Sequence, residues 1–293
     1  MTCDYIFYTK NEKSVVVFSK IRVPFDMPKT GVETIKALKN DLINAIKDLQ
    51  PSENCVLQAR YGMTNKKSFY DVENVLFYNI GTANFNSLTN QGVVFSAVSE
   101  EEIDNIRKQC NIPNEFNHYY EYLIVEKGNE NPFNKLLAEW KNISLKCHGL
   151  KVADCWKGIK NEADKIKNYS SIDCDNNDTF SLFLEIEKPK NTRFNVMVAM
   201  KPLLDGLICS FHSSRFDDHE LEYFSQMLNC EKDILNDNQK SVLGERKSKF
   251  LHIYRNNLKW NPADDLCDYV SISITEGDSW ELSGKVYSNN IKK

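Results

Sequence analysis

The chain has 293 residues, of which 41% are hydrophobic and 11% aromatic, and its formal net charge is −4. This composition is typical of a globular protein with a sizeable core, and it excludes a disordered chain or a coiled coil. The acidic balance argues against a protein that coats nucleic acid through bulk charge. Any contact with DNA or RNA must therefore come from a local basic patch.

The sequence lacks several features that mark membrane or secreted proteins. No apolar run approaches the roughly 20 residues that a membrane span requires. The first residues lack the basic and apolar segments of a secretory signal. The nine cysteines are odd in number and scattered, without the spacing of a disulfide framework. We therefore expect a cytoplasmic protein that has no membrane partner.

The N-terminal part of the chain is expected to mix strands with amphipathic helices. Thr30 with Glu33 forms a capping box ahead of an apolar stripe, and Ser99 with Glu102 forms another, so a helix is predicted after each. Short apolar or alternating runs predict strands at 14–25, 55–62, 72–81, 92–98 and 119–128. Further helices are predicted at 132–145, with Pro132 in the first turn, and at 154–168.

The polar run at 168–179 predicts a boundary between an N-terminal α/β lobe, residues 1–167, and a C-terminal α+β lobe, residues 168–293. The second lobe is expected to contain a hairpin (180–190 and 193–201), helices (202–212, 218–229 and 243–259) and two closing strands (268–277 and 280–288). We therefore predict an α+β fold of mixed sheets and amphipathic helices in two lobes. One continuous mixed sheet is the alternative.

The densest group of reactive side chains lies between residues 201 and 220. Asp205 and His212 are seven residues apart and would share one side of the predicted helix at 202–212. A carboxylate and an imidazole in this arrangement could bind a metal ion, or act as an acid–base pair. Asp217 and Glu220 have the spacing of a helix N-cap, which needs no function to explain it.

A second acidic group consists of Asp71 and Glu73. On the strand predicted at 72–81 these two side chains would point to the same face. Paired carboxylates can hold Mg²⁺ or Mn²⁺ together with water molecules, so both residues join Asp205 and His212 as candidate catalytic residues. The alternative interpretation is a solvated beginning of a strand.

The segment 243–260 carries the strongest spatial pattern. On a helix its apolar residues, including Tyr254, would fall on one arc, and basic residues would fall opposite. The candidate nucleic-acid-binding residues on that opposite side are Arg246, Lys249, Arg255, Lys259 and Trp260. Such a face could bind the phosphates of DNA or RNA and stack on a base. A solvated face and a surface for an acidic protein partner are the alternatives.

Two hypotheses of different classes follow. In the first, the chain is a nucleic-acid-processing protein that uses Mg²⁺ or Mn²⁺ for phosphodiester hydrolysis. Acids such as Asp205, Asp71 and Glu73 would bind the ion together with His212, which could serve as the base, and this requires the two acidic groups to meet in space. In the second, the chain is a non-enzymatic interaction subunit of a larger complex, with no metal affinity and with an exposed apolar patch.

Overall fold

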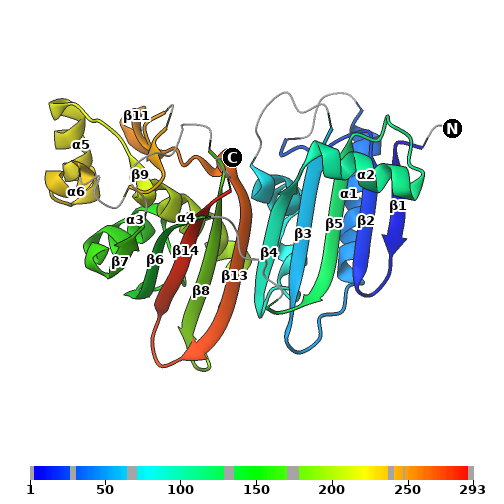
Figure 1. Cartoon of the computed structure of the whole chain (residues 1–293), viewed down its shortest axis with the longest axis horizontal. Helices are drawn as coiled ribbons and strands as arrows, with labels where there is room; N and C mark the ends of the chain where they lie inside the picture. Colours follow the sequence, from blue (N-terminus) through cyan, green and yellow to red (C-terminus); the bar gives the residue numbers. More distant parts are fainter. Residues whose placement is uncertain are drawn as a thin grey trace. The chain divides into compact units, whose positions relative to one another are not determined.

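The structure, a computed structural model, describes residues 3–26, 31–64, 71–128, 135–169, 178–236, 241–246 and 248–289 (Figure 1). Helices and strands form mixed sheets, which confirms the predicted α+β class. The chain divides into two compact units. Unit 1 comprises Met1–Asn131, Asn195–Met197 and Asp268–Ile274; unit 2 comprises Pro132–Phe194, Val198–Cys267 and Thr275–Lys293. The polar run that predicted a boundary after residue 167 lies largely outside the described residues, so that boundary stays a prediction.

Unit 1 is built on one mixed sheet. Its strands follow the order β1 (Tyr5–Lys10), β2 (Ser14–Ser19), β5 (His118–Glu126), β3 (Cys55–Met63), β4 (Gly92–Val98) and β13 (Cys267–Gly277). Within this sheet β3 and β4 are parallel, whereas the other neighbours pair antiparallel. A parallel pair requires a crossover connection, and here the crossover is residues 64–91 between β3 and β4.

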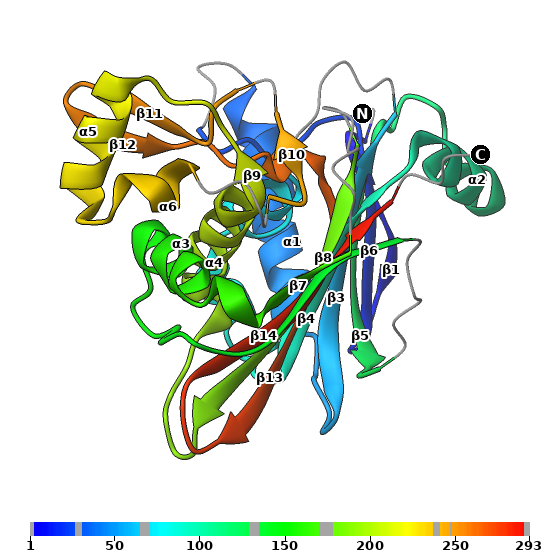
Figure 2. The same ribbon diagram turned by 60° about the vertical axis from the view of Figure 1, so that its left-hand side comes forward.

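Helices cover both faces of this sheet. Helix α1 (Val32–Lys47) lies on one face and α2 (Glu100–Cys110) on the other (Figure 2). The predicted apolar stripe of α1 is buried. The helix begins after Gly31, which has φ 71°, and the predicted cap at Thr30 lies outside the described residues. Ile103 of α2 packs in a buried cluster with Phe18, Val98 and other residues of the sheet.

The crossover corrects one sequence prediction. The segment 72–81 was predicted as a strand, but residues 72–78 are helical, and a π-helical turn, η1, spans Asn74–Tyr78. A second turn, η2, spans Thr82–Phe85. Phe77 packs against Phe95 of β4 with ring centroids 5.5 Å apart. A short apolar run cannot distinguish a strand from a buried helix. Because β3 and β4 are parallel, the segment between them must cross over, and such crossovers are usually helical.

The predicted capping box at the start of α2 is confirmed in part, because the Ser99 Oγ accepts a hydrogen bond from the Glu102 N–H at 3.1 Å. We expect Ser99→Ala to lower the free energy of unfolding by about 1 kcal/mol, since that N–H loses its partner. Urea denaturation monitored by circular dichroism measures the loss. Ser99→Asn, which keeps a capping oxygen, is the matched control, and equal losses in both variants would contradict the capping explanation.

The main strands of unit 2 follow the order β8 (Phe180–Pro189), β14 (Glu281–Ser288), β6 (Lys135–Ser144) and β7 (Ile166–Asn168), and neighbours in this order pair antiparallel. Helices α3 (Val152–Asn161) and α4 (Val196–Phe211) accompany the sheet, and the α4 residue Phe211 packs on Trp140 of β6 at 5.3 Å between ring centroids. The remaining elements are η3 (Ala163–Lys165), β9 (His212–Ser213), α5 (Asp218–Leu228), α6 (Lys232–Asn236), β10 (Gly244–Glu245), β11 (Leu251–Tyr254), β12 (Asn257–Trp260) and η4 (Asp264–Leu266).

Two predictions in unit 2 are wrong. Residues 132–145, predicted as a helix, contain strand β6, and the strand predicted at 193–201 contains the beginning of α4. Pro202 consequently lies inside α4 rather than in its first turn. Strand β6 pairs with both β14 and β7, and these long-range pairings override the local helix preference of its sequence.

The segment 243–260 also differs from its prediction, because its described residues, 243–246 and 248–260, form no helix. Strands β11 and β12 form a hairpin in which Leu251 pairs with Trp260 and Tyr254 pairs with Asn257. The turn residues Arg255 and Asn256 have φ values of 49° and 58°. Two successive left-handed residues are typical of a type I′ turn, which matches the twist of a two-stranded hairpin.

Candidate functional site

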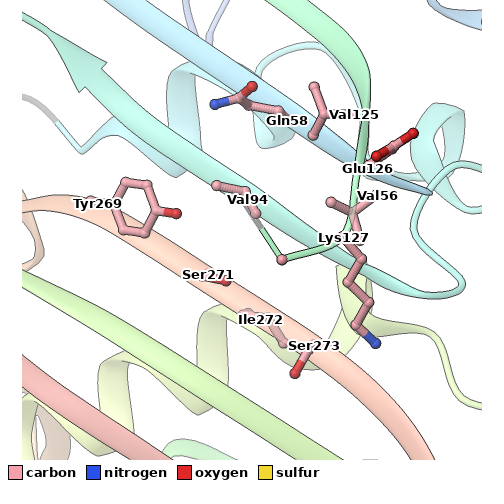
Figure 3. A pocket seen from close by; sticks show the side chains of 11 residues that line it. Val56, Gln58, Val94, Val125, Glu126, Lys127, Tyr269, Ser271, Ile272 and Ser273 are labelled. Atoms are coloured by element: carbon pink, nitrogen blue, oxygen red, sulfur yellow. The ribbon is translucent and has the colours of Figure 1, made fainter. Parts of the chain in front are cut away.

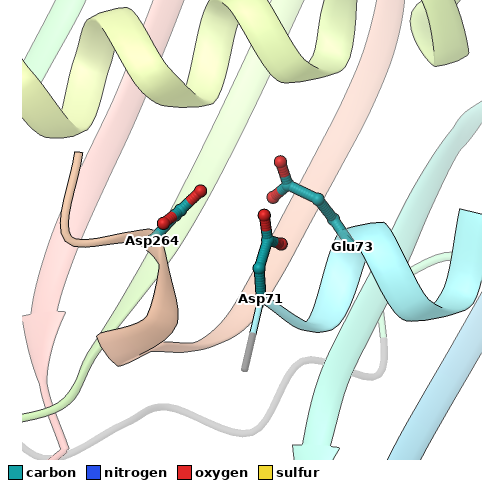
Figure 4. Close-up of side chains that lie close together, drawn as sticks. All are labelled: Asp71, Glu73 and Asp264. Atoms are coloured by element: carbon teal, nitrogen blue, oxygen red, sulfur yellow. The ribbon is translucent and has the colours of Figure 1, made fainter. Parts of the chain in front are cut away.

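Asp71 and Glu73 lie in unit 1, where the crossover from β3 begins its helical part (Figure 4). The Asp71 Oδ1 accepts a hydrogen bond from the Asn74 N–H at 3.2 Å, and the Asn74 side-chain amide donates to the other oxygen of Asp71. Carboxylate oxygens of Asp71 and Glu73 lie within 4.8 Å of one another. The two residues are therefore brought together, on a helical turn instead of the predicted strand.

The burial of this acidic pair is unequal. Glu73 is only 4% exposed, whereas Asp71 is half-buried. A carboxylate is costly to bury unless hydrogen bonds or cations compensate for its charge. The beginning of a helical turn favours negative charge, and carboxylates are preferred ligands of hard divalent cations. This acidic group could hold a metal ion.

Asp205 belongs to a separate ionic group within unit 2. The Lys201 Nζ lies 3.2 Å from the Asp205 Oδ1 and 3.1 Å from the Asp264 Oδ2, so one ammonium joins α4 to η4. Burial raises the pKa of Asp205 to about 6, against the opposing effect of Lys201 and with a further contribution from the negative charge of Asp264. Asp205 can therefore exchange a proton close to neutral pH.

His212 follows α4 directly and is 1% exposed. Among the described residues, neither of its ring nitrogens has a hydrogen-bond partner. Burial, with the positive charge of Arg246, lowers the pKa of His212 to about 3. The imidazole is thus neutral at physiological pH. Asp205 has Lys201 as its partner rather than His212, so a joint metal site of these two residues stays a prediction.

Three of the predicted nucleic-acid-binding residues have structural partners in unit 2. Arg246 is buried, donates to the Asp178 carbonyl oxygen at 3.2 Å and lies over the Phe180 ring. Lys249 pairs with Glu220 at 2.8 Å. Trp260 packs against Trp156 and Phe250, with ring centroids 6.0 and 6.5 Å away. These three side chains make contacts that stabilise unit 2. The segment is not the predicted solvent-facing helix.

The other two residues, Arg255 and Lys259, meet at an exposed tyrosine. Tyr254 is 54% exposed, and its ring centroid lies 5.1 Å from the Arg255 Cζ and 5.8 Å from the Lys259 Nζ. In a strand pair, alternate residues share a face, so Tyr254 and Lys259 project with His252 away from the face that carries Leu251. We call His252, Tyr254, Arg255 and Lys259 the hairpin face.

Sequence reasoning missed three features here. Tyr254 was assigned to the apolar arc of a helix, whereas period-2 alternation places it on the hairpin face. The pair of left-handed turn residues, Arg255 and Asn256, leaves little trace in the sequence because the usual glycine is absent. Lys201 and Asp264 were missed because their ion pair joins positions 63 residues apart.

No family model matches the sequence, and no curated protein or solved structure is significantly similar to it. Within the described residues, no helix has both the length and the apolar character needed to cross a membrane. The arguments for a function therefore come from the residues of this chain.

Proposed function

We propose that the chain is a nucleic-acid-processing protein that cleaves phosphodiester bonds with Mg²⁺ or Mn²⁺. The observation that carries the proposal is the hairpin face, where an exposed tyrosine lies beside two cationic side chains. The acidic group of Asp71 and Glu73 supplies the second part, a set of oxygen ligands suited to a hard divalent cation.

The hairpin face combines the two interactions that hold a single strand. Base stacking on an aromatic side chain contributes about 1–3 kcal/mol per base, and it tolerates any sequence. Arg255 and Lys259 supply the charge that binds backbone phosphates. The whole chain is acidic, so this local patch, rather than bulk charge, would attract the polyanion. Two-stranded ribbons also enter nucleic-acid grooves, although an exposed tyrosine favours an unpaired strand.

The catalytic part of the proposal rests on the acidic group. When bound to carboxylates, a divalent ion lowers the pKa of a water molecule and neutralises charge on a phosphate. Asp71 and Glu73 are the proposed ligands. His212 is a poor general base, since its pKa is about 3 and its ring is buried.

The cysteines of the described residues are all free thiols, which supports our proposal of a cytoplasmic protein. The same hairpin face could instead receive an acidic protein partner, as in the interaction-subunit hypothesis. Salt dependence and base stacking distinguish these occupants, because a peptide partner offers carboxylates without bases that could stack on Tyr254.

Binding of fluorescein-labelled single-stranded DNA and RNA, followed by anisotropy over a range of salt concentrations, tests the hairpin face. We expect Arg255→Ala with Lys259→Ala to reduce the salt slope by about 1.4, because each lost phosphate contact removes about 0.7 for single strands. Tyr254→Ala should weaken binding about 10-fold and leave the salt slope unchanged, since stacking carries no charge. Lys285→Ala, at an exposed lysine of β14, is the matched control.

Absence of binding, or wild-type binding by the Tyr254 and Arg255/Lys259 variants, would contradict a nucleic-acid role for the hairpin face. If the same variants lose binding to poly-glutamate but not to nucleic acid, the interaction-subunit hypothesis takes its place. The two outcomes are separable, because Tyr254→Ala should impair stacking on bases far more than attraction to a polyanionic peptide.

Thermal unfolding with Mg²⁺, Mn²⁺ or EDTA tests the acidic group. A ligand at 100 times its dissociation constant adds about 2.7 kcal/mol of stability, which raises the melting temperature by several degrees. We expect Glu73→Gln to abolish the metal-dependent rise, together with metal-dependent cleavage of the labelled strands. Asp48→Asn, at an exposed carboxylate of unit 1, should retain both. A rise that survives Glu73→Gln would remove this residue from the ligand set.

A further inference from the structure

A groove lies on the sheet of unit 1 (Figure 3), and it shares no lining residue with the acidic group or the hairpin face. It has a volume of about 160 Å³, and all of its lining residues belong to unit 1. The residues that define its chemistry are Val56, Gln58, Val94, Val125, Lys127 and Ser271. They come from four neighbouring strands, β5, β3, β4 and β13, and from the residue that follows β5.

The strand register explains why the apolar side chains form a continuous floor. Val125 pairs with Val56, Gln58 pairs with Val94, and Val94 pairs with Ser271, so these side chains stand side by side across the sheet. Three branched aliphatic side chains therefore form the base of the groove, with an amide and a hydroxyl beside them. Gly92 pairs with Ser273 and adds no side chain of its own, which leaves this end of the floor open.

Lys127 closes one end of the groove. Its N–H donates to the Asn54 carbonyl oxygen at 2.9 Å, and its Nζ lies 3.4 Å from the carbonyl oxygen of Ile274 on β13. The aliphatic stem therefore reaches from the end of β5 towards β13. A distance of 3.4 Å is long for an N–H···O hydrogen bond, and an ammonium has three donors. Lys127 can thus offer N–H groups and a positive charge to a ligand.

The polar groups of the groove limit the charge of its ligand. Within the described part of the chain, the Gln58 side chain, which lines the groove, makes no hydrogen bond (Figure 3). Glu126 lines the rim and would repel a second negative charge. The groove contains one lysine and no arginine among its lining residues, so it lacks the bidentate donors that favour phosphate.

The volume limits the size of the ligand. A cavity of roughly 150 Å³ lined by apolar side chains accommodates benzene, so a groove of about 160 Å³ fits an apolar body the size of one aromatic ring. We propose that this groove binds a small organic monocarboxylate, whose ring-sized apolar body rests on the three valines while its carboxylate pairs with Lys127. The Gln58 amide supplies a hydrogen bond that orients the ligand.

Phenylacetate is the probe that tests this site, and phenylacetamide is its neutral isostere. Titration of each into ¹⁵N-labelled protein, followed by ¹H–¹⁵N correlation spectra, should shift amide resonances of Val94 and Ser271 with phenylacetate. We expect phenylacetamide to bind at least 10-fold more weakly. Lys127→Met, which keeps the aliphatic stem, should weaken phenylacetate binding about 10-fold, whereas Lys13→Met at an exposed lysine of unit 1 should leave it unchanged.

Val94→Trp fills the groove and should abolish binding of both probes, and Gln58→Leu gives an independent readout that does not depend on how well the tryptophan packs. We expect Gln58→Leu to weaken phenylacetate binding several-fold. The proposal is overturned if phenylacetate shifts no resonance around the groove, if the amide binds as well as the acid, or if Lys127→Met binds like the wild type. None of these results bears on the hairpin face or the acidic group.

Discussion

Gly92→Ala should destabilise unit 1 by about 3–5 kcal/mol, because two penalties combine at this position. Gly92 has φ 129°, a conformation that residues with a Cβ rarely adopt. An added Cβ would also lie 2.1 Å from the carbonyl oxygen of Ile272. That oxygen belongs to the backbone of β13, so the contact is relieved only if the β4–β13 ladder moves.

Gly128→Ala separates the two penalties. Gly128 also has a positive φ, 104°, but an added Cβ would meet no atom within 4 Å. We expect a loss of about 1–2 kcal/mol there from backbone strain alone. Urea denaturation of both variants, monitored by circular dichroism, gives the comparison. Equal losses would show that the approach of β13 to Gly92 carries no extra penalty, contrary to the described geometry.

Acid should destabilise unit 2 through His212. Its pKa is about 3 in the folded chain, because burial and the charge of Arg246 oppose protonation, and about 6.5 when unfolded. Between these values the unfolded chain binds more protons, so the free energy of unfolding falls as the pH drops below 6.5. The loss from this residue reaches about 2 kcal/mol at pH 5 and about 3 kcal/mol at pH 4.

Other groups modify this pH dependence in known directions. Burial, with the charge of Arg22, lowers the pKa of His118 in unit 1 to about 4. Protonation of His118 in the unfolded chain therefore also lowers the free energy of unfolding as the pH falls below 6.5. Asp205 acts in the opposite direction. Its pKa is raised to about 6, so the folded state binds its proton more readily than the unfolded state, and acidification through pH 6 adds stability.

His212→Leu isolates the contribution of His212. The replacement removes two ring nitrogens that lack hydrogen-bond partners in the described residues, so stability at pH 7 should change little or rise. The difference in unfolding free energy between pH 7 and pH 5 should shrink by about 2 kcal/mol. The same replacement at exposed His148 serves as control. An undiminished pH dependence in His212→Leu would refute the buried, neutral imidazole as its source.

Local signals predicted those parts of the fold that local chemistry determines. The capping oxygens of Ser99 and Asp217 identified the beginnings of α2 and α5, and the capping box of Asp217 with Glu220 is complete. Residues 72–81, 132–145 and 243–260 were assigned wrongly because their structure depends on distant strands or on a turn without glycine. An apolar run of that length fits a strand or a buried helix equally well.

The candidate site was also predicted only where neighbouring residues in the sequence determine it. Asp71 and Glu73 were identified from the sequence as an acidic pair, although the reason given, a shared strand face, is wrong. Instead, the two residues lie at the start of a helical segment, where their carboxylate oxygens come within 4.8 Å of one another. The partners of Asp205 could not be predicted, since the ion pair between Lys201 and Asp264 depends on tertiary structure. Of the basic residues predicted to face solvent in 243–260, Arg255 and Lys259 are exposed on the hairpin, whereas Arg246 is buried.

Unit 1 is assembled from segments that lie far apart in the sequence, and this has a consequence for synthesis of the chain. The strand that pairs with β4 opposite β3 is supplied by residues 268–274, about 170 positions after β4 ends. At about 5–20 residues per second, a ribosome needs roughly 10 to 35 s to add that length. During this interval the hydrogen-bonding edge of β4, with its apolar residues Val93 and Phe95, has no β13 to pair with. The unpaired edge of β4 in a nascent chain can therefore pair with a wrong strand. A chaperone that covers this edge would matter most before β13 emerges.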